Sequence, residues 1–421
     1  MPDEAVPNYV RVAGYAAIGL LFALVCAVGR LTTYFVLLAA LLALLTPSIR
    51  QAQRLASRSP VDTIFLGSVI TLAVALLASS DEWRDPLYIL NFAPFLIAIP
   101  FRWQLERTAR PDGALIVARL SLTGVIIAGL VAVVQVILLG YTRVGQPLMG
   151  AHDYAHTSMI LGFLALVGCF APGAHRRWPF LLGPILAIGA VLLSGTRGAL
   201  LGAPALALVA FGFALATARR KGQILLAGAV AVAVVALLAA AAYFFGFERA
   251  ISAFDSAGRV LAGQQIDEST RQRLLMLSGG LGAFLESPLF GHGWGDMVKA
   301  VYPHVPPDEV EMMTGFRQLH NGPMSFAVGA GVFGIAAFVA LTIAPILAVL
   351  ATPRDSQFVS RLYFAAVLVV GFAVFQLASI MLGFEFHTVQ YAMMTMVFVA
   401  FVRDPAPPYS PGSAGPAPST R

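Results

Sequence analysis

Long apolar runs joined by short polar connections make up most of this chain. A run of about 17 to 25 apolar residues is long enough to cross the hydrocarbon core of a membrane as a helix. The closest pairs of runs must form tight hairpins. We predict about twelve membrane-spanning helices, near residues 12–29, 31–48, 62–79, 86–101, 113–139, 155–171, 178–193, 198–217, 223–245, 321–350, 362–382 and 386–402.

One connection is far longer than the others and divides the chain. It covers residues 246–320, and part of it has the pattern of an amphipathic helix. Residues 1–245 before it hold the first nine predicted spans, and residues 321–403 after it hold the last three. Residues 404–421 are rich in Pro, Gly and Ser, which predicts a disordered tail.

Composition supports a membrane protein. Hydrophobic residues make up 58% of the chain and charged residues 11%, whereas soluble domains carry about 25% charged residues. The net charge of +6 does not indicate nucleic-acid binding, because the excess is spread over short connections as membrane topology requires. The bilayer is the expected partner, and no nucleic acid is expected.

The distribution of Lys and Arg predicts the orientation, because these residues stay on the cytoplasmic side of short loops. With the N-terminus placed in the cytoplasm, sixteen of the 27 basic residues fall inside and ten outside. Six of those ten lie in the long loop, which is largely exempt from the rule. We therefore predict that both termini are cytoplasmic, and that the long loop and six of the seven histidines of the chain lie on the outer side.

The polar chemistry gathers at that outer face, whereas the predicted spans are nearly bare of charge. Transporters usually carry ionisable residues at mid-membrane, along the path of their substrate. The pattern therefore favours an enzyme with its site at the membrane surface. A lipid-linked-glycan transporter stays open as the alternative outside the enzymes.

Two outer features precede the long loop. In YTRVGQPLMGAHDYAH, the candidates Arg143, His152 and His156 cluster around Asp153, a plausible helix N-cap; the alternative is an interfacial anchor. In LLSGTRGALLG, Arg197 lies in a short turn between two apolar runs. It can bind a head group at the membrane surface, or simply extend to lipid.

Two further features belong to the loop and its end. Arg271 and Arg273 lie in a predicted amphipathic helix that continues to Glu286, and their spacing places them on different faces. We favour Arg271 as the one that faces a site, although both could be solvated. His320 precedes Asn321, an N-cap candidate, so a helix begins directly after it. The helix dipole favours a neutral imidazole, which can accept a proton; a capping role is the alternative.

In their order and spacing these motifs resemble the O-antigen ligase and polymerase superfamily. The resemblance rests on SGTRGAL, STRQRL, ESPLFGHGWG, LHN and GAGVFG, over roughly residues 140–340. It implies a C-type (GT-C) glycosyltransferase fold in the bacterial inner membrane, with its active site in the periplasm. The donor would be a glycan polymer on undecaprenyl pyrophosphate, and in the ligase branch the acceptor is the lipid A core oligosaccharide.

The resemblance also implies roles for single residues. Arg197 and one of Arg271 and Arg273 would bind the donor pyrophosphate, and His320 would be the catalytic base. We take His320, Arg197 and Arg271 as the catalytic candidates, and as substrate-binding candidates Arg273, Arg143, His152, His156 and Asn321. Where many relatives carry an Asn-Pro-Asn-like element this chain reads AHDYAH, which puts the roles of His152 and His156 in doubt.

Neither cofactor nor metal is expected. The chain has no GxxxxGK[ST] pattern for ATP and no H-E-x-x-H pattern for zinc. A rival acidic site for a divalent metal is SSDEWRD, with Asp81, Glu82 and Asp85. Direct attack of the acceptor hydroxyl predicts inversion at the anomeric carbon. The shared motifs do not separate a ligase from a repeat-unit polymerase or a protein O-oligosaccharyltransferase.

Overall fold

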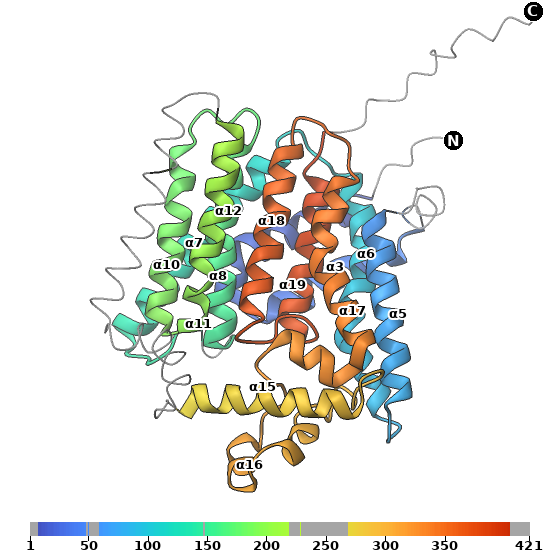
Figure 1. Cartoon of the computed structure of the whole chain (residues 1–421). Coiled ribbons are helices and arrows are strands. Elements are labelled where there is room, and N and C mark those ends of the chain that lie inside the picture. The colour runs from blue at the N-terminus through green and yellow to red at the C-terminus, as the bar shows by residue number, and fades with distance from the viewer. Residues whose placement is uncertain are drawn as a thin grey trace, which may run out of the picture.

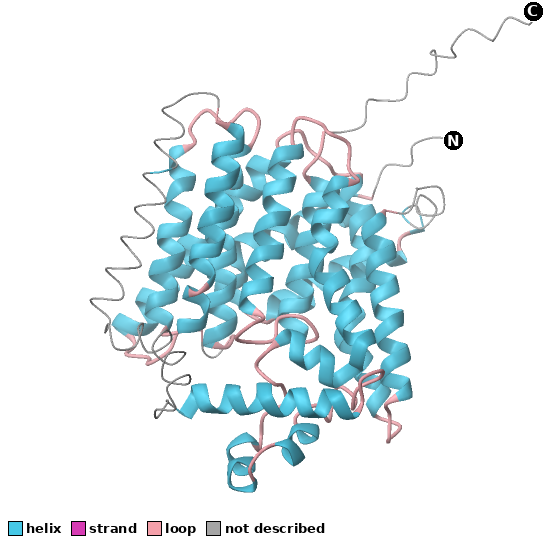
Figure 2. Cartoon of the chain, viewed as in Figure 1, coloured by secondary structure: helices cyan, strands magenta, loops and turns pink. Residues whose placement is uncertain are grey.

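The computed structural model describes residues 7–47, 49, 59–145, 148–218, 228 and 268–404, and for Arg197, Ser269 and Thr270 the backbone only. Every regular element in this part of the chain is a helix (Figure 2). In chain order up to the long loop these are α1 (Asn8–Gly19), η1 (Leu20–Leu24), α2 (Val25–Val28), α3 (Leu31–Leu45), α5 (Pro60–Ala78), η2 (Asp85–Phe92), α6 (Ala93–Glu106), α7 (Gly113–Val133), η3 (Val134–Leu138), α8 (Ala151–Ala165), α9 (Val167–Phe170), η4 (Trp178–Leu181), α10 (Leu182–Ser194), α11 (Arg197–Leu200) and α12 (Gly202–Thr217).

The second half of the chain adds helices of two kinds. Those of the loop region are α15 (Glu268–Glu286), η5 (Lys299–His304) and α16 (Pro307–Met313). Those of the bundle are α17 (Gly322–Leu350), α18 (Phe358–Phe375), α19 (Glu385–Met396) and η6 (Val397–Phe401). The predicted tail, residues 404–421, lies outside the described residues apart from Asp404.

The prediction of a multi-pass helical membrane protein is confirmed by the apolar helices. Eight helical segments of the described chain are long and apolar enough to span a membrane: Asn8–Val28, Pro60–Ala78, Asp85–Glu106, Gly113–Leu138, Ala151–Phe170, Gly198–Thr217, Gly322–Leu350 and Phe358–Phe375. Leu31–Leu45 and Trp178–Ser194 are shorter apolar helices, and α19 with η6 covers the predicted span at 386–402. The predicted span at 223–245 lies outside the described residues, so the count of twelve and the GT-C fold stay predictions.

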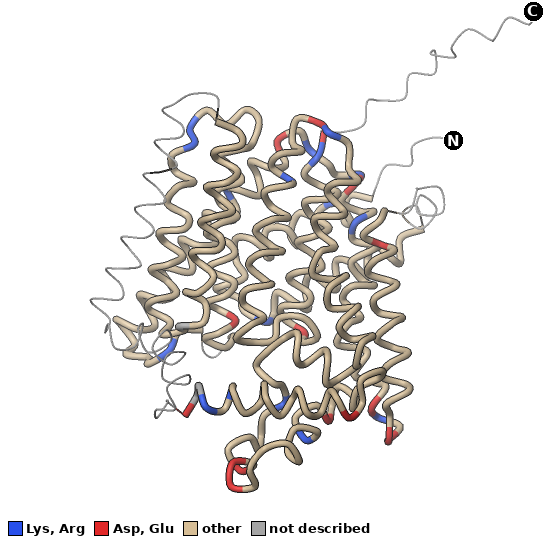
Figure 3. The backbone as a smooth tube through the Cα atoms, in the orientation of Figure 1, with Lys and Arg blue, Asp and Glu red and all other residues tan. Residues whose placement is uncertain are grey.

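The helices form one bundle that the loop region covers at one end. In Figure 1, α15 lies across the end of the bundle, and α16 lies beyond it. Within the bundle, α17 packs along α5, and α8 packs against both α7 and α10. Figure 3 shows that the charged residues of the described chain gather near the two ends of the bundle. This is the distribution expected of a protein that spans a bilayer.

The predicted amphipathic helix is confirmed as α15, which ends at Glu286 as expected. Its buried positions, Met276, Gly279, Gly280 and Ala283, recur at the helical period and form one stripe. A Cβ at Gly279 would press on Val301 of η5, and one at Gly280 would press on Met324 of α17. Small residues on this stripe therefore let α15 lie close to the bundle.

A kink in α17 joins the bundle to the loop that follows α15. Gly331 adopts φ 62° and ψ −147°, which interrupts the helix and leaves backbone groups unpaired. The loop supplies their partners: His292 N donates to Val328 O at 2.8 Å, and Val332 N donates to Pro288 O at 2.8 Å. The motifs ESPLFGHGWG and GAGVFG are thus two halves of one contact. This contact fixes Trp294 beside the end of the bundle.

Candidate active site

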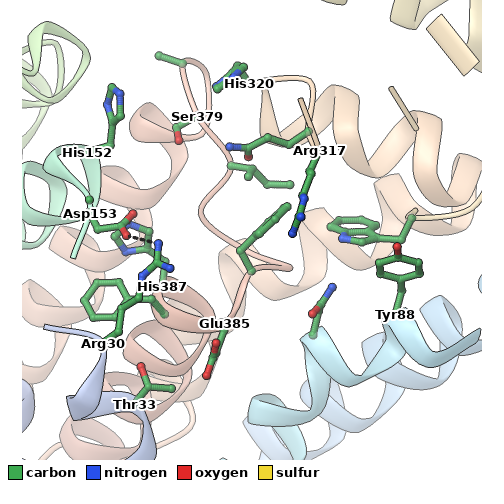
Figure 4. Close-up of a pocket in the computed structure, with 18 of the residues that line it drawn as sticks. Arg30, Thr33, Tyr88, His152, Asp153, Arg317, His320, Ser379, Glu385 and His387 are labelled. Carbon is green, nitrogen blue, oxygen red and sulfur yellow. Dashed lines mark hydrogen bonds and ion pairs between the residues drawn. The ribbon is translucent and has the colours of Figure 1, made fainter. Parts of the chain in front are cut away.

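A cavity of about 920 Å³ lies where α15 covers the bundle (Figure 4). Its walls come from segments far apart in the chain: the turn before α3, η2, the start of α8, α15, the segment before α17, and α19. Eight of its lining residues are acids, arginines or histidines: Arg30, His152, Asp153, Arg273, Arg317, His320, Glu385 and His387. A concave site with convergent polar groups is the usual form of a ligand site.

His320 lies at this cavity and has an unusual backbone. With φ 50° it is the one non-glycine residue of positive φ in the described part of the chain. Such conformations cost free energy and tend to occur at functional sites. The ring packs edge-on against Phe316, with the ring centres 5.1 Å apart. The contact with Phe316 thus fixes one face of the imidazole.

The imidazole of His320 is neutral near pH 7. Its pKa is lowered to about 4, mainly by burial and further by the nearby side chains of Arg273 and His152. The predicted neutral form is therefore confirmed. The main cause is burial, however, rather than the helix dipole from which we predicted it. A neutral imidazole in contact with a cavity can accept a proton from a bound hydroxyl.

Asn321 caps α17, as predicted. Its Oδ1 accepts a hydrogen bond from Met324 N at 2.9 Å, and its Nδ2 donates to Leu377 O at 3.2 Å. Both ends of the side chain are therefore engaged by backbone, and Asn321 does not line the cavity. These two hydrogen bonds fix the backbone next to His320. Its proposed contact with substrate stays a prediction.

Arg271 and Arg273 point in different directions from α15, as their spacing predicts. Arg273 lines the cavity. Arg271 instead forms an ion pair with Glu309 of α16, a carboxylate that is only 4% exposed. We favoured Arg271 as the residue that faces the site. The structure places Arg273 there, and Arg271 joins α15 to α16.

Arg197 is the first residue of the four-residue helix α11, and its side chain is outside what the structure describes. The turn before it is well defined. Gly195 has a left-handed backbone, with φ 69°, and Thr196 Oγ1 donates a hydrogen bond to Ala151 O at 3.2 Å. This bond ties the turn to the first residue of α8. Arg197 therefore begins its helix close to the segment that carries His152.

The three remaining candidates differ in position. His152 lines the cavity. His156, one turn further along α8, is 2% exposed and stacks on Phe375 with ring centres 4.6 Å apart, so it lies below the cavity surface. Arg143 is exposed in the loop before α8 and does not line the cavity. Of these three candidates, only His152 lines the cavity together with His320.

Sequence reasoning missed an ion-pair network on the cavity wall. Asp153 Oδ2 accepts a hydrogen bond from Arg30 at 3.1 Å, and Asp153 Oδ1 lies 3.3 Å from His387 Nε2. The N-cap role that we predicted for Asp153 is wrong, because α8 begins earlier, after Gly150. The carboxylate is thus free to pair across helices. The signals that could have indicated the network were an arginine in a short outer connection and a histidine at the start of the last span.

The rival acidic site SSDEWRD has a local structural role. Asp85 Oδ2 accepts hydrogen bonds from the backbone N–H groups of Asp81 and Glu82, at 3.0 and 2.8 Å. Asp85 therefore organises the turn before η2. None of the three carboxylates lines the cavity.

A comparison with known protein families shows that several of these residues lie in one matched region. Residues 182–339 match the family model described as O-Antigen ligase. This confirms the resemblance to the O-antigen ligase superfamily over that region, which includes Arg197, Arg273 and His320. The match ends beyond the kink of α17, so it also covers both halves of the contact between the loop and that helix. No curated protein matches the chain.

Proposed function

We propose, from the O-antigen ligase match of residues 182–339, that this protein is an O-antigen ligase. It would move a glycan polymer from undecaprenyl pyrophosphate to the lipid A core oligosaccharide, on the periplasmic face of the inner membrane. The observation that carries the proposal is that Arg273 and His320, two residues of the matched region, line one cavity. A donor of this kind brings its own activated bond, so the reaction needs no nucleotide.

Arginines would stabilise the departing pyrophosphate. Breaking the bond between the sugar and the phosphate leaves negative charge on the lipid diphosphate, and guanidinium groups bind phosphate oxygens in pairs of hydrogen bonds. Arg273 is at the cavity wall, and Arg197 begins α11 next to the start of α8. Fixed cations at this position can supply the charge stabilisation that a divalent metal supplies elsewhere.

His320 would act as the general base. An acceptor hydroxyl is too weak an acid to react unaided, and a base within hydrogen-bond reach contributes about 10²- to 10⁴-fold. Its low pKa keeps the ring unprotonated, and a bound pyrophosphate raises that pKa because negative charge favours the imidazolium. The hydroxyl oxygen then attacks the anomeric carbon, the bond to the phosphate breaks, and the proton ends on His320. Attack opposite the leaving group inverts the configuration.

The direct experiment is transfer by the purified protein in nanodiscs. Polymer-loaded undecaprenyl pyrophosphate and lipid A core should yield joined product in the presence of a chelator and without ATP. NMR of the new linkage should show inversion. Product on a lipid-linked glycan instead would identify a polymerase, and product on a peptide a protein O-oligosaccharyltransferase. Movement of the donor between leaflets without transfer would identify a transporter.

A further inference from the structure

The cavity has a second wall that the proposed reaction does not yet use. We call it the aromatic wall; it consists of Tyr88, Asn91 and Trp294. Figure 4 shows Tyr88 on the opposite side of the cavity from Asp153 and His387. On that opposite side, Arg30 and Asp153 form an ion pair and so neutralise each other. Among the described residues, the aromatic wall contains no such ion pair.

Two of its side chains present unused polar groups. Trp294 is 2% exposed, and its indole N–H has no hydrogen-bond partner among the described residues. Phe92 and Phe326 hold the indole by edge contacts, with ring centres 4.9 and 5.0 Å away. Asn91 makes no side-chain hydrogen bond within the described part of the chain. A buried donor without a partner is costly, so a ligand that satisfies it gains affinity.

Tyr88 adds an apolar surface beside these groups. It is 41% exposed, and its ring lies so close to Gly295 that a Cβ there would overlap it. The backbone of the loop after α15 thus supports one side of the ring. An aromatic ring next to amide and N–H groups suits a saccharide, which offers C–H faces to the ring and hydroxyls to the polar groups.

Arg317 completes this side of the cavity with a charge. Figure 4 shows its side chain extending into the cavity on the side of Tyr88. Within the described part of the chain it has no ion-pair partner, unlike Arg30 and Arg271. An unpaired guanidinium is a ready ligand for a carboxylate or phosphate. Arg317 and His320 both line the cavity, so one saccharide can contact both.

We propose that Arg317 and the aromatic wall form a subsite for a sugar that bears a negatively charged group, and that this sugar belongs to the acceptor. The inference rests on the proposed function. The subsite would hold the acceptor by its anionic substituent and its ring, so that a hydroxyl of the same saccharide reaches His320. Arg273 would remain with the donor pyrophosphate.

The test is binding of delipidated core oligosaccharide to the protein in nanodiscs, measured by calorimetry without donor. Three forms of the probe are compared: intact, dephosphorylated, and carboxyl-reduced. Arg317→Ala should weaken binding of the intact form by about 10- to 100-fold, the range of a hydrogen bond to a charged group. It should leave unchanged the form that lacks the recognised anion, which identifies phosphate or carboxylate as the group. Arg317→Lys should recover part of the loss.

Two further variants complete the design. Tyr88→Ala should weaken all three forms alike, because the ring is not expected to read charge. Arg84→Ala, an exposed arginine outside the cavity, should change none of them. The proposal is overturned if Arg317→Ala leaves acceptor binding unchanged, or if it weakens binding of undecaprenyl pyrophosphate instead. Failure of the proposed function would give a different result: the wild-type protein would bind the oligosaccharide but would not transfer any glycan to it.

Discussion

The guanidinium of Arg30 and the carboxylate of Asp153 lie 3.1 Å apart on the cavity wall, although 123 positions separate them in the chain. The same carboxylate lies 3.3 Å from His387, so one acid holds groups from the turn before α3 and from α19. Glu385, at the first position of α19, also lines the cavity. The shape of this wall therefore depends on a single aspartate.

Removing that charge should impair the site without unfolding the protein. Asp153→Asn keeps the size of the side chain but leaves Arg30 without its anionic partner, free to turn into the cavity. We expect turnover to fall by about 10- to 100-fold, the range for hydrogen bonds to charged groups, with little change in the melting temperature. Steady-state kinetics with thermal unfolding measures both. Asp112→Asn, which breaks an exposed pair with Arg110, is the control, and an equal loss of turnover there would contradict the prediction.

The pH dependence of transfer should report His320. The base works in its neutral form, and its pKa is about 4 in the free protein. The profile of kcat/KM, which reports groups of the free enzyme, should therefore stay level as pH falls through 6.5 and decline only near pH 4. With donor bound, the pyrophosphate should raise the pKa, so the acid limb of kcat should lie at higher pH. His320→Ala should remove about 10²- to 10⁴-fold of the rate.

A direct titration of His320 tests whether bound pyrophosphate raises its pKa, rather than low pH simply reducing activity. NMR of ring-labelled histidine, with His320→Gln to assign its signal, should show the His320 pKa rise when inorganic pyrophosphate is added. A signal that titrates at the same pH with and without pyrophosphate would mean that the anion does not bind beside the imidazole. Binding of undecaprenyl pyrophosphate to His320→Ala should remain close to wild type, because the base acts on the acceptor.

The two arginines of α15 should have different phenotypes. Arg273→Ala should weaken donor binding and lower turnover by about 10²- to 10³-fold, as loss of a positioned donor does, at an unchanged melting temperature. Arg271→Ala should lower the melting temperature, because it leaves the buried carboxylate of Glu309 unpaired. The double variant Arg271→Ala/Glu309→Gln should regain stability. If Arg271→Ala lost turnover at full stability, Arg271 would be the donor ligand.

The sequence could predict features that depend on neighbouring residues, but not those that depend on the packing of distant segments. The cap at Asn321 and the end of α15 at Glu286 follow from patterns within a few residues, and both are confirmed. A local pattern also singles out His320, which lies at the cavity; its role as the base stays a prediction. The choice between Arg271 and Arg273 needed the position of Glu309, on another helix. The network of Arg30, Asp153 and His387 needed the packing of three distant segments. No local pattern reports such packing, because many bundles accommodate the same apolar runs.

A single added methyl group at the kink of α17 should destabilise the protein. Gly331→Ala adds one methyl group where φ is 62° and where a Cβ would overlap the carbonyl of Leu289. Strain and overpacking together should cost about 1 to 3 kcal/mol, seen as a lower melting temperature. Because the kink holds the loop that carries Trp294, acceptor binding should weaken as well. Gly67→Ala, in α5 with no atom near its Cβ, is the matched control and should match or exceed wild-type stability. Equal melting temperatures for the two variants would show that the loop does not depend on the kink.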